Sequence, residues 1–176
     1  ETRVRWSHPA DSGAAPSTWD ETDTTKDAGF YDLDDGGGKV VDCLTLGDTN
    51  IIYKDTQTIG MQYIGGQYVF RFYNIFKESG LLSRRCAKPF FGQHLCITNG
   101  DVITHSGGGE PNPILDHKNK KWLFGAIDST NYQRTFISPN YQKNEMWICF
   151  PESGASFATL ALVWNFRDNT TTVREL

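Results

Sequence analysis

Short hydrophobic runs separated by turn-forming residues dominate the C-terminal part of the chain. Aromatic and β-branched residues fill positions 145–150 and 160–166, and Asp168 and Asn169 follow the second run. Such runs favour β-strands, and Asp and Asn favour hairpin turns because their side chains bond nearby backbone groups and tolerate a positive φ. The pattern predicts three antiparallel strands at 145–150, 160–166 and 171–175.

Two earlier segments show the same alternation of runs and turns. Gly65-Gly66 and Asn99-Gly100 each separate two apolar runs. The Gly-Gly pair suits a hairpin whose two central positions need a positive φ, and Asn-Gly between alternating hydrophobic runs is a strong hairpin signal. The sequence therefore predicts two further groups of strands before the C-terminal one. The expected strands are 40–46, 50–54, 58–64 and 67–73, then 85–90, 94–98, 101–105 and 114–115, with 134–138 opening the last group.

The N-terminal region combines one short strand with a long loop. Residues 3–7 alternate polar and apolar side chains, which places Val4 and Trp6 on one face of a strand. Positions 8–29 are rich in Pro, Ser, Asp, Thr and Gly, and Trp19 is their only large apolar residue. We expect this loop to contact another subunit or another protein.

One segment shows helical spacing. Apolar residues recur every three to four positions between Trp122 and Ile127, and Asp116 is placed to cap the backbone of a helix that follows it. The spacing predicts a short helix over 116–127.

The three groups of strands repeat with a near-constant period. Their second strands begin near Ile51, Leu95 and Trp147, about 44 and about 52 residues apart. A four-stranded unit with this period is typical of a β-propeller blade, because one small sheet buries its two faces only against neighbouring sheets. The sequence predicts an all-β fold of antiparallel four-stranded blades, about three of them with a remnant of a fourth. The alternative is a single β-sandwich with similar hairpins.

This repeat also predicts the organisation of the chain. We expect 1–38 to form the N-terminal strand and long loop of a preceding blade. The blades themselves are expected at 39–83, 84–130 (with the short helix) and 131–176, all within one propeller-like domain. Because propellers use at least about four blades, we expect the chain to be a fragment of a longer one.

Composition and charge exclude several classes of function. Seventeen Lys and Arg residues stand against 21 Asp and Glu, for a net charge of −4, and no basic run is present. Specific binding to nucleic acid is therefore not expected. The apolar runs are far shorter than the roughly 20 residues that a membrane helix needs.

Residues suited to catalysis or metal binding are scattered. The four histidines, His8, His94, His105 and His117, show no metal-ligand spacing, although the Asn99-Gly100 hairpin brings His94 and His105 together, where we expect solvent-facing strand ends. Positions 32–36 resemble a calcium loop only partly, because the glycine comes one position early. The four cysteines, Cys43, Cys86, Cys96 and Cys149, form no C-x-x-C pair, and Cys96 and Cys149 are expected in the core. We predict no catalytic, cofactor-binding or metal-binding residues.

The aromatic segment 67–73 is the one stretch that suits sugar stacking. Tyr68, Phe70 and Phe72 fall on one face of the predicted strand, and its alternation already accounts for them as core residues. We also expect Trp147 and Trp164 to lie in the core of the last unit.

Several stretches resemble the propeller-bearing tail hub or nozzle proteins of tailed bacteriophages, especially short-tailed ones. The resemblance spans nearly the whole chain, and one departure is Thr171-Thr172, where the family usually has an aromatic residue after Asn-Thr. The matching stretches are Arg3-Val-Arg-Trp-Ser, Ala28-Gly-Phe-Tyr-Asp-Leu, Ile51-Ile-Tyr-Lys, Ile59-Gly-Met-Gln-Tyr, Phe91-Gly-Gln-His, Asn99-Gly-Asp-Val-Ile, Ile127-Asp, Asn131-Tyr-x-Arg-Thr-Phe, Glu145-Met-Trp-Ile-Cys-Phe-Pro and Ala161-Leu-Val-Trp-Asn-Phe-Arg-Asp-Asn-Thr-Thr.

The resemblance implies a structural, non-enzymatic role in a virion. In such proteins several copies, typically six, form a ring that meets the tail adaptor and tail fibre proteins, closes the DNA channel and opens for genome ejection. The implied location is the phage tail, assembled in the cytoplasm of the host bacterium. The mild negative charge agrees with DNA passing through without being held. The alternative is a carbohydrate-binding or glycan-cleaving propeller of a tail fibre or tailspike, which would require a pair of carboxylates if it cleaves. A weaker alternative is a secreted lectin-like propeller.

Overall fold

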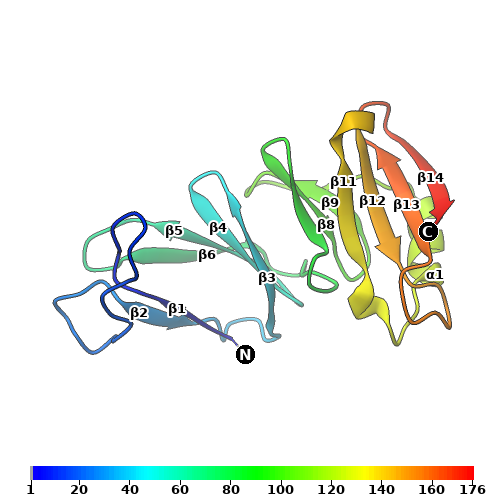
Figure 1. Ribbon diagram of the computed structural model, residues 1–176. Helices are drawn as coiled ribbons and strands as arrows, with labels where there is room; N and C mark the ends of the chain where they lie inside the picture. The colour runs from blue at the N-terminus through cyan, green and yellow to red at the C-terminus, as the bar shows by residue number, and fades with distance from the viewer. Residues whose placement is uncertain (1) are drawn as a thin grey trace.

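The computed structural model describes residues 2–176 and has an all-β architecture with a single α-helix in that range (Figure 1). Its strands form three four-stranded antiparallel sheets and one two-stranded sheet. The first two pairing strands are β1 (Arg3–Trp6) and β2 (Gly29–Asp32). The first four-stranded sheet contains β3 (Val40–Leu46), β4 (Thr49–Lys54), β5 (Thr58–Tyr63) and β6 (Phe70–Phe76).

The other two four-stranded sheets follow in chain order. The second sheet contains β7 (Ala87–Phe90), β8 (Gln93–Ile97), β9 (Val102–His105) and β10 (Asn112–Pro113). The third contains β11 (Phe136–Asn140), β12 (Glu145–Phe150), β13 (Leu160–Asn165) and β14 (Thr170–Glu175). Helix α1 (His117–Ala126) and the 3-10 turns η1 (Tyr132–Arg134) and η2 (Tyr141–Lys143) complete the secondary structure.

Each four-stranded sheet is a simple meander in which every strand pairs with the next one in sequence. The strands of the third sheet lie within two residues of their predicted positions, because aromatic and β-branched runs and the turn around Asn169 mark their ends. Asn169 has a φ of 51°, as this turn requires. The all-β prediction is confirmed.

The second sheet is buried on both faces. Side chains at His94, Cys96 and His105 face the first sheet, where they meet Tyr53 of β4. The opposite face meets the third sheet, with the rings of Phe90 and Trp164 centred 5.5 Å apart. Burial of both faces explains why β8 and β9 contain almost no exposed residue instead of alternating.

The first strands of the three sheets are neighbours. β3 contacts β7, and β7 contacts β11. Hydrogen bonds reinforce both contacts: Arg85 donates its backbone N–H to Asp42 Oδ2 (3.0 Å), and its carbonyl accepts from Ile137 N (3.1 Å). A single hydrophobic core runs through all three sheets and includes Leu123 of α1.

The helix forms where the sequence predicts it. Asp116 is its N-cap and accepts a hydrogen bond from Asn119 N at 2.9 Å, and the chain leaves the helical conformation at Ile127. Lys120 pairs with Asp101 at 2.7 Å, and the Asn119 side chain donates to Thr171. The helix thereby joins the second sheet to the last strand of the third.

Several predicted positions are wrong. Strand β6 begins at Phe70 because 64–69 form a loop, so Tyr68 lies exposed outside the strand, although Gly65 and Gly66 do have positive φ. The short strand β10 lies at Asn112–Pro113, two residues before its predicted place. Trp147 is only partly buried, on the outer face of the third sheet.

The pairing of β1 with β2 was not predicted. The pattern places 8–29 in a loop and predicts no strand between that loop and position 40, whereas Gly29–Asp32 pairs in register with Arg3–Trp6. Val4 and Trp6 do share one face, and this two-stranded sheet packs on the first four-stranded sheet through Leu33. Trp19, in the loop, is exposed.

Candidate functional site

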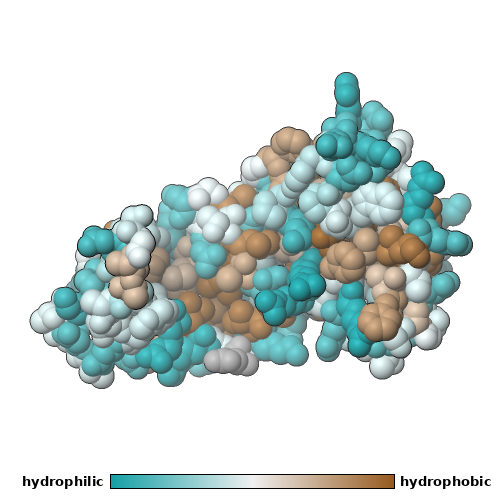
Figure 2. Space-filling view, viewed as in Figure 1, coloured by the Kyte–Doolittle hydropathy of each residue, from teal (hydrophilic) through white to brown (hydrophobic). Residues whose placement is uncertain are grey.

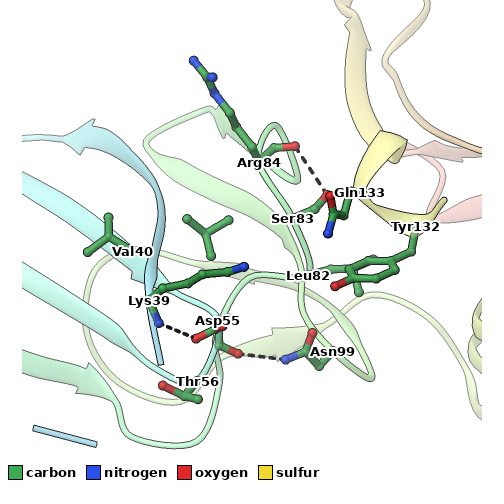
Figure 3. Close-up of a pocket in the computed structure, with 11 residues that line it drawn as sticks. Lys39, Val40, Asp55, Thr56, Leu82, Ser83, Arg84, Asn99, Tyr132 and Gln133 are labelled. Carbon is green, nitrogen blue, oxygen red and sulfur yellow. Dashed lines mark hydrogen bonds between the residues drawn. The ribbon is translucent and has the colours of Figure 1, made fainter. Parts of the chain in front are cut away.

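A polar cleft opens where the first strands of the sheets meet, and its volume is about 490 Å³ (Figure 3). Lys39 and Asp55 come from the ends of strands of the first sheet, Ser83 from the segment before the second, Asn99 from the β8–β9 turn of the second, and Tyr132 from η1 before the third. Each of the three units thus contributes residues to its wall.

Hydrogen bonds to Asp55 shape one wall of this cleft. Its Oδ1 accepts from the backbone N–H of Lys39 at 2.9 Å, and its carbonyl accepts from Asn99 Nδ2 at 2.8 Å. The Arg84 side chain points away from the cleft, whereas Lys39 extends toward Leu82 (Figure 3). Asp55 therefore ties the first sheet to the Asn99 turn of the second.

The chemistry available in this cleft is limited. Asp55 is the one carboxylate among the residues that line it, and its Oδ1 is already bonded to backbone. Glycoside hydrolysis uses two carboxylates about 5–10 Å apart. Ser83, the hydroxyl at the inner end, contacts Cys86 Sγ (3.2 Å) and the Thr135 carbonyl (3.4 Å). The cleft thus offers polar contacts to a ligand but no acid–base pair.

A second cluster, fully internal, joins the first and second sheets. The Tyr53 hydroxyl lies 2.7 Å from His94 Nδ1, 2.7 Å from His105 Nε2 and 3.3 Å from Cys96 Sγ. The two imidazoles are directly cross-strand partners in the β8–β9 hairpin. The sequence predicts that these histidines meet, but its expectation that they face solvent is wrong, since both are buried.

The neighbours of the two rings fix the direction of every hydrogen bond. His94 Nε2 lies 3.1 Å from the carbonyl of Thr45, which can only accept, so Nε2 carries the proton and Nδ1 accepts from Tyr53. His105 Nδ1 accepts from Gly107 N at 3.2 Å, so its Nε2 donates to Tyr53. The Tyr53 oxygen accepts from His105 and Cys96 and donates to His94, so its hydrogen-bonding capacity is filled.

This arrangement holds only if all four groups are neutral. Burial lowers the pKa of His94, and burial with the neighbouring His94 lowers the pKa of His105 to about 4. Burial raises the pKa of the Tyr53 phenol and raises the pKa of Cys96 to about 12. The cluster therefore joins the first and second sheets through hydrogen bonds between uncharged groups.

The same cluster is not a metal site. No group of three or more His, Cys, Asp or Glu side chains among residues 2–176 is arranged to hold a metal ion. The Tyr53 hydroxyl stands where the two imidazoles and the thiol converge. The sequence gives no signal for Tyr53, which reads as one more apolar strand residue.

The acidic turn after β2 is held by a buried lysine. Lys54 is fully buried, and its Nζ donates to the carbonyls of Leu33 (2.6 Å) and Asp35 (3.1 Å). Asp32, the first position of the partial calcium pattern, instead pairs with Arg3 at 2.6 Å. These contacts give the turn a structural role in attaching the N-terminal sheet.

Asp128 holds a loop in place by hydrogen bonds in the third unit. Its Oδ1 accepts from the N–H groups of Thr130 (2.9 Å) and Asn131 (2.7 Å), and its Oδ2 from Gly154 N (2.8 Å). The backbone N–H groups of Gly154 and Asn131 lower the pKa of this carboxyl. The stretch Ile127-Asp with Asn131 therefore holds the turn at 128–131 against the loop that contains Gly154.

The cysteines have structural surroundings. Cys86, Cys96 and Cys149 are buried and Cys43 is exposed, and all four are free thiols. Burial raises the pKa of Cys86 and of Cys149 to about 11, which suppresses thiolate formation.

Comparisons with known proteins supply no relative: no family model matches the sequence, and no curated protein matches it. None of the helices formed by residues 2–176 has the length and apolar character that a membrane span requires.

Proposed function

We propose that this chain is a non-enzymatic structural module of a phage tail hub or nozzle, and that its four-stranded sheets are blades of a β-propeller. The contact of β3 with β7 and of β7 with β11 carries the propeller part of this proposal, and the resemblance of the stretches quoted in the sequence analysis carries the tail part. In a propeller the blades are arranged radially around a central channel, so equivalent inner strands of successive blades are neighbours. A two-layer sandwich does not account for a middle sheet that is covered on both faces.

The outer faces of the first and third sheets are evidence for further blades on either side of the three sheets. On the outer face of the third sheet, the partly buried Phe136 and Trp147 pack against a small cluster that includes Cys149 and Val163. Figure 2 shows hydrophobic surface over the part of this sheet where β11 and β12 lie. At the opposite end, the β1–β2 sheet covers the first sheet. A further sheet on the outer face would repeat the packing already present twice.

In this proposal several copies of the whole protein, six by the resemblance, form a ring below the tail adaptor, in contact with tail fibre proteins. The ring closes the DNA channel until genome ejection. The net charge of −4 supports passage of DNA without retention. The protein then belongs to the virion and assembles in the cytoplasm of the host bacterium.

The native mass of the complete gene product that contains this chain tests the proposal. A closed ring of several copies, seen by native mass spectrometry and by negative-stain microscopy, is the expected result. A monomer or trimer that shortens host capsule or lipopolysaccharide chains would overturn it in favour of a glycan-cleaving tail fibre or tailspike.

A further inference from the structure

A groove of about 710 Å³ lies between the N-terminal sheet and the outer hairpin of the first sheet. One wall is the segment 24–28, and the other is the loop 66–69 between β5 and β6. Trp6, Phe70 and Phe72 line it between these walls. The groove is separate from the polar cleft and from the Tyr53 cluster.

Its floor is a set of aromatic rings in fixed positions. The rings of Trp6 and Phe70 meet edge to face at 5.1 Å, and those of Tyr31 and Phe72 stack at 4.3 Å. Trp6 also donates its indole N–H to the carbonyl of Asp27 at 2.7 Å. Because Gly29 has no side chain, the indole lies flat against β2; a Cβ there would be 2.7 Å from the ring. The floor is therefore preorganised for contact with another flat apolar surface.

The rims of the groove are polar and exposed. Lys26 and Asp27 stand on one wall, and Gln67 and Tyr68 stand on the other. Within residues 2–176, the side chains of Lys26, Gln67 and Tyr68 form no hydrogen bond or ion pair. Lys26, Gln67 and Tyr68 offer an ammonium donor, an amide and a phenol to a ligand, whereas the Asp27 carboxylate lies 3.9 Å from His8 Nδ1.

We propose that this groove binds a neutral oligosaccharide of hexopyranose units. The C–H faces of sugar rings suit an aromatic floor, and hydroxyls, which both donate and accept, suit rims that carry both functions. A nucleic acid fits poorly, because Lys26 is the one cationic residue among those that line the groove, and its neighbour Asp27 carries the opposite charge. A proline-rich peptide also fits poorly, because it lacks the N–H donors that the side-chain amide oxygen of Gln67 can accept. The inference does not depend on the proposed tail function.

Binding of maltohexaose, cellohexaose and mannohexaose to the chain, measured by saturation-transfer NMR and calorimetry, tests this proposal. At least one of these sugars is expected to bind. Tyr68→Ala is expected to weaken that binding about tenfold or more, since one wall of the groove loses both an aromatic ring and its hydroxyl. The matched control is Phe157→Ala, because Phe157 is 72% exposed against 73% for Tyr68 and lies outside the groove. Circular dichroism of both variants establishes that they fold.

Three results would overturn the proposal. One is the absence of saturable binding by all three sugars. Another is sugar binding that Tyr68→Ala leaves unchanged, because the sugar would then sit elsewhere. The third is binding of a decaproline peptide with no binding of any sugar, which would assign the groove to peptide recognition. The ring or monomer state of the complete protein is measured independently, so the two proposals fail separately.

Discussion

At the residue scale, buried polar side chains decide how the sheets of this protein are joined. Three such residues form hydrogen bonds with buried or half-buried groups of another segment of the chain: Tyr53, Lys54 and Asp128. An unsatisfied buried polar group costs about 1–3 kcal/mol, so these residues specify which segments pack together. Catalytic groups in similar settings are usually poised to change charge, whereas the Tyr53 cluster is built to stay neutral.

Replacing Tyr53 with phenylalanine tests how much the stability of the protein depends on the Tyr53 hydroxyl. The change leaves the acceptor of His94 and the donor of His105 without a partner, and we expect unfolding to become easier by about 2–3 kcal/mol. Urea denaturation measures the effect, with Tyr68→Phe as the control on an exposed tyrosine. Equal midpoints for the parent and Tyr53→Phe would contradict the role of the hydroxyl.

Replacing each of the two tryptophans of the third sheet by alanine should lower the free energy of unfolding by different amounts. Trp164 is 6% exposed within the shared core and donates its indole N–H to Asn169 at 3.0 Å. Trp164→Ala is expected to cost about 3–5 kcal/mol. Trp147→Ala should cost clearly less, because Trp147 lies on the outer face where it is only partly buried. Denaturation midpoints in the opposite order would refute this assignment.

At the element scale, the helix and the hairpins follow local signals. α1 starts and ends where Asp116 and Ile127 predict, because an N-cap bond and apolar spacing act within a few residues. Strand β6 departs from its predicted start because the connection after β5 extends over 64–69, and Tyr68 stays exposed in that loop instead of pairing with β5. The β1–β2 pairing joins residues 23 to 29 positions apart, from Trp6 with Gly29 to Arg3 with Asp32, so no local pattern indicates it.

Removal of the helix cap gives a test at this scale. Asp116→Ala should lower the midpoint of thermal unfolding, since the N–H of Asn119 loses its acceptor. Asp168→Ala, a change of the same type in an exposed turn, serves as the control. Thermal unfolding followed by circular dichroism compares the two, and a larger loss for Asp168→Ala would be incompatible with the capping role.

At the scale of the whole molecule, the first and second sheets are joined by groups that must stay uncharged. The pKa of His94 is lowered and that of His105 falls to about 4, whereas an unfolded histidine has a pKa near 6.5. Between these values the unfolded chain binds more protons than the folded one. The free energy of unfolding therefore falls as pH drops from about 6.5 toward 4.

Urea midpoints measured from pH 7 to pH 5 check this expectation. Over that range the carboxylates with lowered pKa, such as Asp116 and Asp128, stay ionised, so the histidines dominate the change. His105→Gln should flatten the pH dependence, because the buried imidazole with the lowered pKa is removed. A parent protein with constant stability across this range would contradict the neutral cluster.

The sequence by itself determined what depends on neighbours along the chain. Strand runs such as 145–150, the capped helix after Asp116 and the turns at Asn99 and Asn169 all came from local propensity and from period-two alternation. The meeting of His94 with His105 also followed, because a tight hairpin fixes its own register.

Only the tertiary structure decided what depends on contacts between sheets. The burial of His94 and His105, their link to Tyr53 and the outward position of Trp147 all depend on which face another sheet covers. The groove over Trp6 likewise needs 24–28 and 66–69 to lie side by side. Alternation along a strand divides side chains between two faces, but it does not say what packs on either one.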